Sequence, residues 1–164
     1  MKKPGIPIDI PGFGKVQINS ILSDYTGTLS FHGKLVTGVK DRLLRLVELL
    51  DIHVVTADSF GTAAEQLAGL PILWRKLNGE NEDLQKLHYA TSLDPCCLAS
   101  FGNGNNDRLH LKAVKEAGGL AIAVENGEGC AFDAIVNANI FVAGAVNAFD
   151  LLLEPTRLRA TLRF

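Results

Sequence analysis

The run Asp24-Tyr25-Thr26-Gly27-Thr28-Leu29 places one carboxylate directly after an apolar stretch and before a tight turn. Apolar residues at positions 16, 18, 21 and 22 predict a strand ahead of it, and parallel sheets bind ligands beyond the carboxyl ends of their strands. Gly27 would allow a sharp reversal and the close approach of a phosphoryl group to backbone N–H groups. Asp24 is therefore a candidate nucleophile, although Asp before Gly is also a common turn former.

Two later segments end in the same way. Val54 and Val55 precede Thr56-Ala57-Asp58, and the apolar residues 98–101 precede the loop Gly102-Asn103-Gly104-Asn105-Asn106-Asp107. Lys86 lies between these two segments in a stretch with helical spacing. Because the carboxyl ends of parallel strands meet at one edge of a sheet, all the polar clusters are expected to lie together.

These segments resemble the four-part signature of the haloacid dehalogenase (HAD) superfamily of phosphohydrolases, most closely its P-type ATPase branch. Residues 24–29 are close to the DKTGTL of the ion pumps, residues 102–107 are close to their GDGxND, and the resemblance covers residues 16–142. Polar residues interrupt the most apolar region, 131–153, so it cannot supply the roughly 20 apolar residues of a membrane span. The chain is thus similar to the small soluble P-type ATPase-like phosphatases of prokaryotes.

The resemblance implies a role for each motif. Asp24 would be the nucleophile that becomes an aspartyl-phosphate, and Mg²⁺ would be the cofactor. The implied catalytic residues are Asp24, Thr26, Thr56 and Lys86. The implied phosphate-binding residues are Tyr25, Thr26, Thr56, Ala57 and Lys86, and the implied metal ligands are Asp24, Thr26 through its carbonyl, Asn103 and Asp107.

Two positions depart from the family pattern. Thr26 stands where most HAD phosphatases have an Asp that acts as general acid and base. Asn103 stands where most have a metal-binding Asp, so one negative charge is missing and weaker metal binding is expected. The substitutions leave two classes of function open: a slow Mg²⁺-dependent phosphatase, or a noncatalytic or regulatory phosphoryl-binding module.

Three assignments have alternatives. Lys76 is a rival to Lys86 as the phosphate-binding lysine. Asp58 resembles the Asp of the pumps' TGD segment, but it could equally cap a helix that begins near Thr62. Thr56 could be an ordinary β-branched residue at the end of a strand.

Length and composition indicate a single domain, 1–164, with an N-terminal extension, 1–14, and a C-terminal tail, 156–164. The chain is 47% hydrophobic and 21% charged, which is ordinary for a globular protein. A net charge of -2 argues against a nucleic-acid partner. Prolines at positions 4, 7 and 11 interrupt the region where a signal peptide would lie, so a cytoplasmic location without a membrane partner is expected.

The three cysteines have no CxxC spacing and are expected to be small buried residues. The four histidines show no metal-binding spacing and are expected in turns, in a strand and on helix surfaces.

The hydrophobic pattern alternates between strand-like and helix-like periods, which predicts an α/β fold with a mainly parallel sheet and helices on both faces. The resemblance implies that this is the three-layer Rossmann-like HAD fold.

Residues 28–36 are expected to form a flap hairpin. The segments where HAD enzymes insert a cap domain are too short for one, so the site is expected to be open unless a second copy of the chain covers it in a homo-oligomer. The expected partner is a small phosphorylated substrate. The further predicted strands are 53–56, 72–77, 98–101 and 120–124, and the predicted helices are 39–50, 62–68, 82–89 and 107–117. Residues 131–136, 140–142 and 146–153 are expected to complete the domain.

Overall fold

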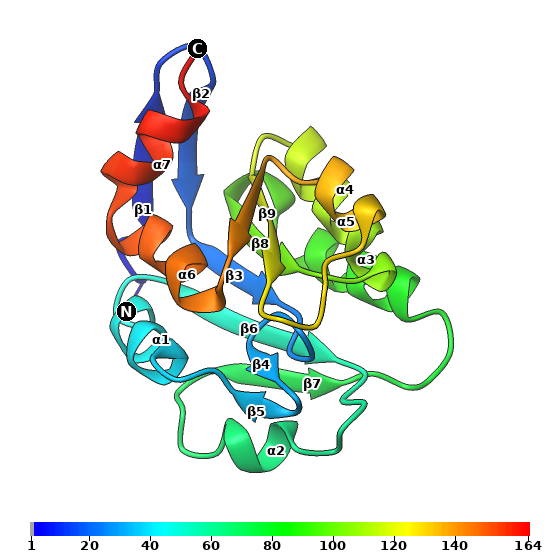
Figure 1. The fold of residues 1–164 in the computed structure, drawn as a ribbon. Helices are drawn as coiled ribbons and strands as arrows, with labels where there is room; N and C mark the ends of the chain where they lie inside the picture. The colour runs from blue at the N-terminus through cyan, green and yellow to red at the C-terminus, as the bar shows by residue number, and fades with distance from the viewer. Residues whose placement is uncertain (1) are drawn as a thin grey trace.

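Six parallel strands form the central sheet of the computed structural model, which describes residues 2–164. Their order across the sheet is β10-β9-β8-β3-β6-β7 (Figure 1). The strands are β3 (Ser20–Ser23), β6 (Asp51–Thr56), β7 (Leu73–Lys76), β8 (Leu98–Gly102), β9 (Leu120–Glu125) and β10 (Ile140–Ala143). The central strands β3, β6, β8 and β9 are almost fully buried, as near-continuous apolar strands covered on both faces must be.

Helices cover both faces of this sheet, which confirms the predicted three-layer architecture (Figure 1). One face carries α1 (Val39–Leu46) and α6 (Ala145–Leu153), and the other carries α3 (Glu82–Ser92), α4 (Arg108–Glu116) and α5 (Phe132–Val136). Successive residues of a strand point to opposite faces. Accordingly Ile21 joins the core beneath α1 and α6, whereas Leu22 joins the core beneath α3 and α4.

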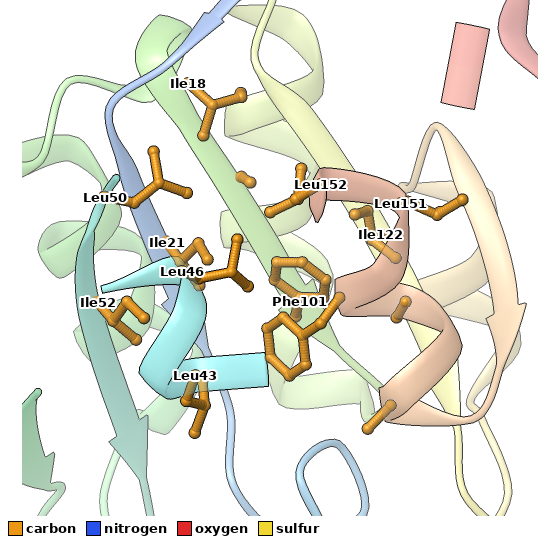
Figure 2. Close-up of a cluster of buried hydrophobic side chains, with 14 of the residues drawn as sticks. Ile18, Ile21, Leu43, Leu46, Leu50, Ile52, Phe101, Ile122, Leu151 and Leu152 are labelled. Atoms are coloured by element: carbon orange, nitrogen blue, oxygen red, sulfur yellow. The ribbon is translucent and has the colours of Figure 1, made fainter. Parts of the chain in front are cut away.

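The larger core lies between the sheet and the pair α1 and α6 (Figure 2). Side chains from β3, β6, β8 and β9 meet the apolar faces of the two helices there. The rings of Phe101 on β8 and Phe149 on α6 lie 4.8 Å apart, a distance at which aromatic pairs attract. This packing fixes the carboxyl ends of the central strands relative to one another.

The N-terminal region differs from the prediction of one strand through positions 16–22. β2 (Gly14–Ile18) pairs with β1 (Ile6–Ile10) in an antiparallel hairpin, and the chain then turns at Asn19 into β3. The N–H of Asn19 donates to the carbonyl of Cys97, and its own carbonyl accepts from Asp51. The expected extension 1–14 therefore contains a strand whose apolar side joins the core.

The C-terminal tail is a docked helix, α7 (Pro155–Leu162), which lies against β1 (Figure 1). Leu158 of this helix is fully buried, and the N–H of Phe164 donates to the carbonyl of Pro11. The C-terminal end of the chain is thus tied to the turn between β1 and β2.

The flap is the predicted hairpin, built from β4 (Ser30–Phe31) and β5 (Lys34–Leu35). The loop after β6 holds the short helix α2 (Ala63–Gln66), and two 3₁₀ turns, η1 (Pro95–Cys97) and η2 (Asn105–Asp107), flank β8. Within residues 2–164 the two positions where a cap domain could be inserted hold only the flap and α2 with β7. No helix in that range is long and apolar enough to cross a bilayer.

Candidate active site

Asp24 begins the loop that leaves the carboxyl end of β3. Its N–H donates to the carbonyl of Phe101 on β8 at 3.1 Å, which extends the sheet pairing by one residue. The carbonyl of Tyr25 accepts from the N–H groups of Thr28, Leu29 and Ser30, and this closes the loop on itself. The carboxyl of Asp24 is therefore held at the end of the strand, and Asp24 is only 5% exposed to solvent.

Gly27 permits the tight turn for two reasons. Its φ of 73° lies in the left-handed region that glycine favours. A Cβ at this position would also collide with the side chain of Asn103 from the loop after β8. The close approach brings the predicted metal ligand Asn103 directly onto the turn that follows Asp24, where its Oδ1 accepts from the hydroxyl of Thr28 at 3.2 Å.

Lys86 links the two acidic groups of the site. It projects from α3 with its side chain 1% exposed, and its Nζ lies 3.2 Å from Asp24 Oδ1 and 2.7 Å from Asp107 Oδ1. A buried ammonium is stable only when it is paired. The rival Lys76 is exposed near the end of the edge strand β7. The structure thus brings Lys86, and not Lys76, to Asp24.

Asp107 is the most completely bonded group of the cluster. Its Oδ2 accepts from the N–H groups of Asn103 and Gly104 at 3.0 and 2.9 Å, and its Oδ1 faces Lys86 and His110. Burial opposes the charge of this carboxylate, but Lys86 and His110 hold its pKa well below the usual range. Both oxygens are engaged, so the predicted role of Asp107 as a metal ligand would require one of these contacts to be given up.

His110 is a member of this buried cluster that sequence reasoning missed. It was expected on a helix surface, yet it is 1% exposed, with Nε2 at 3.0 Å from Asp107 Oδ1 and Nδ1 at 2.6 Å from the hydroxyl of Ser100. Burial lowers the pKa of His110 in spite of the nearby carboxylate. The neutral ring donates from Nε2 to Asp107, and Nδ1 accepts from Ser100, because a carboxylate can only accept. The spacing of three residues between Asp107 and His110 was the available signal.

His53 and the three cysteines can also be compared with the positions predicted from the sequence. His53 lies in β6 as expected but is buried, and its Nδ1 is 2.9 Å from the hydroxyl of Tyr89. The expectation that all three cysteines are buried is wrong: Cys96 is exposed, and Cys97 and Cys130 are partly exposed. These residues lie in connections at the surface and not in strands or helix cores.

Burial raises the pKa of Asp24 to about 7. Lys86 opposes this rise, and the negative charge of Asp107 adds to it. One ammonium is therefore shared between two buried carboxylates, and a second positive charge is needed to keep both ionised. A divalent cation beside Asp24 would supply that charge.

The donor atoms around Asp24 fit a small hard cation. Within residues 2–164 the bonds to its carboxylate go to Oδ1, where the N–H of Tyr25 donates at 2.8 Å and Lys86 lies at 3.2 Å. Oδ2 is then available, and the Asn103 amide oxygen lies on the neighbouring loop. Carboxylate, carbonyl and amide oxygens are the ligands that Mg²⁺ prefers. The residues present therefore fit Mg²⁺, with Asp24, the carbonyl of Thr26 and Asn103 as candidate ligands.

The segment after β6 lies beside the same edge of the sheet. Thr56 is fully buried, and its hydroxyl oxygen accepts from the N–H of Asp58 at 2.9 Å; within residues 2–164 its own proton has no acceptor and is available to donate. The carboxylate of Asp58 accepts from the N–H groups of Thr62 and Ala63 at the beginning of α2. Asp58 therefore caps that helix, the second of the two roles weighed for it.

The side chains of two predicted phosphate-binding residues, Tyr25 and Thr26, differ in their contacts. The hydroxyl of Tyr25 donates to the carbonyl of Gly33 in the flap, and the side chain is fully buried. The hydroxyl of Thr26 is buried and has no hydrogen-bond partner among the described residues. Thr26 therefore places an unpaired polar atom at the position where most HAD phosphatases carry a carboxylate.

Solved structures share this fold over most of their length. A protein of Vibrio cholerae assigned as a 3-deoxy-D-manno-octulosonate 8-phosphate phosphatase has a TM-score of 0.64 at 17% identity, covering 93% of this chain and 97% of its own. The cobalt-bound phosphatase of that name from Haemophilus influenzae has a TM-score of 0.58 at 14% identity, covering 89% of each chain. The enzyme of that name from Moraxella catarrhalis, in complex with magnesium, phosphate and the sugar acid KDO, has a TM-score of 0.51 at 19% identity, covering 89% of this chain and 94% of its own.

Sequence comparison gives a closer but shorter match. An uncharacterised protein of Methanocaldococcus jannaschii is 41% identical over 66 residues, which are 40% of this chain and 67% of that protein. No protein-family model matches the chain. The chain belongs to the same family as the M. jannaschii protein, and it has the fold of the HAD superfamily hydrolases.

Proposed function

We propose that this protein is a Mg²⁺-dependent phosphatase that acts on a small phosphorylated molecule through an aspartyl-phosphate on Asp24. One observation carries the proposal: Lys86 lies between Asp24 and Asp107 in a buried cluster at the carboxyl edge of the parallel sheet. An isolated strand-end Asp could be a turn former, but a turn former does not require a buried ammonium at 3.2 Å.

The reaction would proceed in two displacements. An oxygen of Asp24 would attack phosphorus in line, and the bond to the leaving oxygen would break as the Asp24–phosphorus bond forms. The leaving oxygen takes a proton from water, because Thr26 offers no acid at that position. Water would then attack the phosphoenzyme, releasing inorganic phosphate and regenerating the carboxylate of Asp24.

Lys86 and Thr56 would stabilise the negative charge on the transferring group. The ammonium of Lys86 already borders Asp24, and the free proton of the Thr56 hydroxyl would donate to a phosphoryl oxygen. Asp107 would position Lys86, since its Oδ1 lies 2.7 Å from the ammonium. Mg²⁺, when bound, supplies positive charge that lets an anionic nucleophile approach an anionic phosphate.

The neighbours support the cofactor and the substrate class. The Moraxella enzyme holds magnesium and phosphate, and the Haemophilus enzyme holds cobalt. Both are named as phosphatases of a phosphorylated sugar acid. At 14–19% identity these neighbours support phosphatase chemistry on a small phosphate ester without naming the ester for this chain.

A second function rests on Thr26. Its buried hydroxyl has no partner within residues 2–164, and a hydroxyl is a poor general base near neutral pH. A protein that binds phosphate, or accepts it on Asp24 without releasing it, would need no base there. The alternative is therefore a regulatory phosphoryl-binding module.

A phosphatase assay separates the two functions. The protein would be incubated with p-nitrophenyl phosphate and a panel of phosphorylated metabolites, with Mg²⁺ or with excess chelator, alongside Asp24→Asn. We expect Mg²⁺-dependent turnover that Asp24→Asn lowers by several orders of magnitude. Turnover that survives in Asp24→Asn, or in chelator, would exclude the proposed mechanism. Binding of phosphate without any turnover would favour the regulatory module.

A further inference from the structure

Three side chains of types that can ligate a metal lie close together at the edge of the sheet opposite the candidate active site. Asp94, Cys96 and Cys97 lie in and before η1, the turn that connects α3 to β8. One ligand atom from each residue lies within 4.8 Å of the other two. The length of β8, roughly 15 Å at about 3.3 Å per residue, separates this cluster from the loop that holds Asn103. We propose that Asp94, Cys96 and Cys97 bind one thiophilic divalent cation of the Zn²⁺ class.

Two of the three donor–donor distances are close to those of one face of a tetrahedron, and the third is within 4.8 Å. A tetrahedral Zn²⁺ with Zn–S bonds of about 2.3 Å holds two sulfurs about 3.8 Å apart. The Sγ atoms of Cys96 and Cys97 are 3.6 Å apart. The same geometry with a Zn–O bond of about 2.1 Å places sulfur and oxygen about 3.6 Å apart, and Cys96 Sγ lies 3.2 Å from Asp94 Oδ1. Small side-chain movements would bring all three donors onto one cation.

Neighbouring backbone holds the turn in place. The carbonyl of Cys97 accepts from the N–H of Asn19 at 2.8 Å, and the N–H of Cys97 donates to the carbonyl of Asp94 at 3.0 Å. Gly119, directly before β9, lies so close that a Cβ there would collide with the carbonyl of Pro95. The donors are thus attached to a backbone that cannot move far, which lowers the entropy lost on binding.

The donor set selects the class of cation. Two thiolates favour Zn²⁺, Cd²⁺ and similar soft or borderline ions over Mg²⁺, which prefers oxygen ligands. Each coordinated thiol gives its proton to the buffer, so two protons leave as one cation binds. Because Cys96 is exposed, water can fill the fourth position. A bound cation would tie the end of α3, the helix that carries Lys86, to the beginning of β8.

Cadmium is the probe that tests this site, because a cadmium–thiolate bond has its own ultraviolet charge-transfer band. The reduced full-length protein would be titrated with Cd²⁺ in anaerobic buffer. We expect the band to saturate at one equivalent and Zn²⁺ to abolish it by displacement. Cys96→Ser and Cys97→Ser should each weaken Cd²⁺ binding by roughly 10- to 100-fold or more. Mutation of a residue that only hydrogen-bonds to a metal ligand already lowers metal affinity by that factor, and these variants remove a ligand itself. Asp94→Asn should keep the band but weaken binding.

Two controls make the outcome decisive. Cys130→Ser removes the third thiol and should leave the titration unchanged. Asp24→Asn should also leave it unchanged, so the result does not depend on the proposed phosphatase activity. Zn²⁺ should raise the Tm of the wild type but not of the Cys96→Ser/Cys97→Ser variant. No band in the wild type, or a band that persists in the double variant while its metal-free Tm matches the wild type, would overturn the proposal.

Discussion

His110 Nε2 lies 3.0 Å from Asp107 Oδ1, the same oxygen that accepts a hydrogen bond from the ammonium of Lys86. The bonds continue in both directions, from His110 to Ser100 and from Lys86 to Asp24. All five side chains are nearly or fully buried. A buried polar network of this kind is rigid when every member is paired, so the position of Lys86 beside Asp24 depends on a histidine that does not touch Asp24.

His110 should therefore act as a positioning residue for Lys86. His110→Leu removes the donor to Asp107, and we expect kcat to fall roughly 10- to 100-fold, as for other residues that orient a functional group. His110→Gln offers an amide N–H in place of Nε2–H and should restore much of the activity. Steady-state kinetics of both variants provide the measurement, with thermal denaturation to show that each is folded. Equal loss in the Leu and Gln variants would contradict a role through this hydrogen bond.

The charge on Asp24 should destabilise the protein when no cation is bound. The pKa of Asp24 is about 7 in the folded protein, against an ordinary value of 3.8, so the folded state binds more protons between these values. Stability from this group is then lost as pH rises from about 4 to about 7. Asp24→Asn removes the effect. We expect the variant to have a higher Tm than the metal-free wild type at pH 8, and nearly the same Tm at pH 4.

The size of that difference can be measured by thermal denaturation in chelator. A change of 1 kcal/mol shifts Tm by about 2–4 °C for a protein of this size, so a difference of several degrees is expected. Mg²⁺ should raise the Tm of the wild type and have little effect on Asp24→Asn. A difference between the two proteins that does not vary with pH would show that Asp24 is not held in an unfavourable charge state.

Kinetics of the two lysines test the placement of the phosphate-binding ammonium. Lys86→Ala should lose on the order of 10² or more in kcat/KM, as removal of one transition-state donor does. Lys76→Ala should be nearly silent, because Lys76 is exposed on the edge strand. Lys86→Ala also leaves two carboxylates without their ammonium, so Lys86→Arg, which keeps the charge, is the control for folding. The reverse ranking of Lys86→Ala and Lys76→Ala would place the phosphate site elsewhere.

The parallel sheet and the meeting of its polar strand ends could be predicted because both follow from local patterns. Apolar runs that end at Asp24, Thr56 and Gly102 identify strands whose carboxyl ends share one edge. The hairpin of β1 and β2 could not be separated from β3, because the apolar pattern continues across Asn19 and the break arises from its contacts with Cys97 and Asp51. The hydrophobic pattern of one strand does not show which distant segment the strand pairs with, so the break at Asn19 could not be predicted from it.

The burial of individual side chains on the helices was also not predictable from the sequence pattern. His110 lies on α4, where only half of the other residues are apolar, and it has no metal-binding spacing, so it was expected at a helix surface. Lys86 was predicted at the site from the family resemblance, whereas the mostly polar pattern of α3 alone would place it at the surface. Both are buried because Asp107 and Asp24 lie between α3, α4 and the sheet, and each buried carboxylate needs a partner. Their burial is a consequence of the site and not of the helix pattern.

Thr26 leads to the last prediction, that water attack on the phosphoenzyme is the slow step. A carboxylate tuned to the working pH contributes roughly 10² to 10⁴-fold as a general base, and the buried, unpaired hydroxyl of Thr26 cannot replace it. Rapid-quench experiments on the wild type should show a burst of phospho-Asp24 followed by slow turnover. Thr26→Val should leave burst and turnover unchanged, which would show that the hydroxyl takes no part. Thr26→Asp should shorten the lifetime of the intermediate when Mg²⁺ is present to offset the added charge beside Asp24. A wild type without a burst, when product release is not limiting, would contradict the assignment of the slow step to the missing carboxylate.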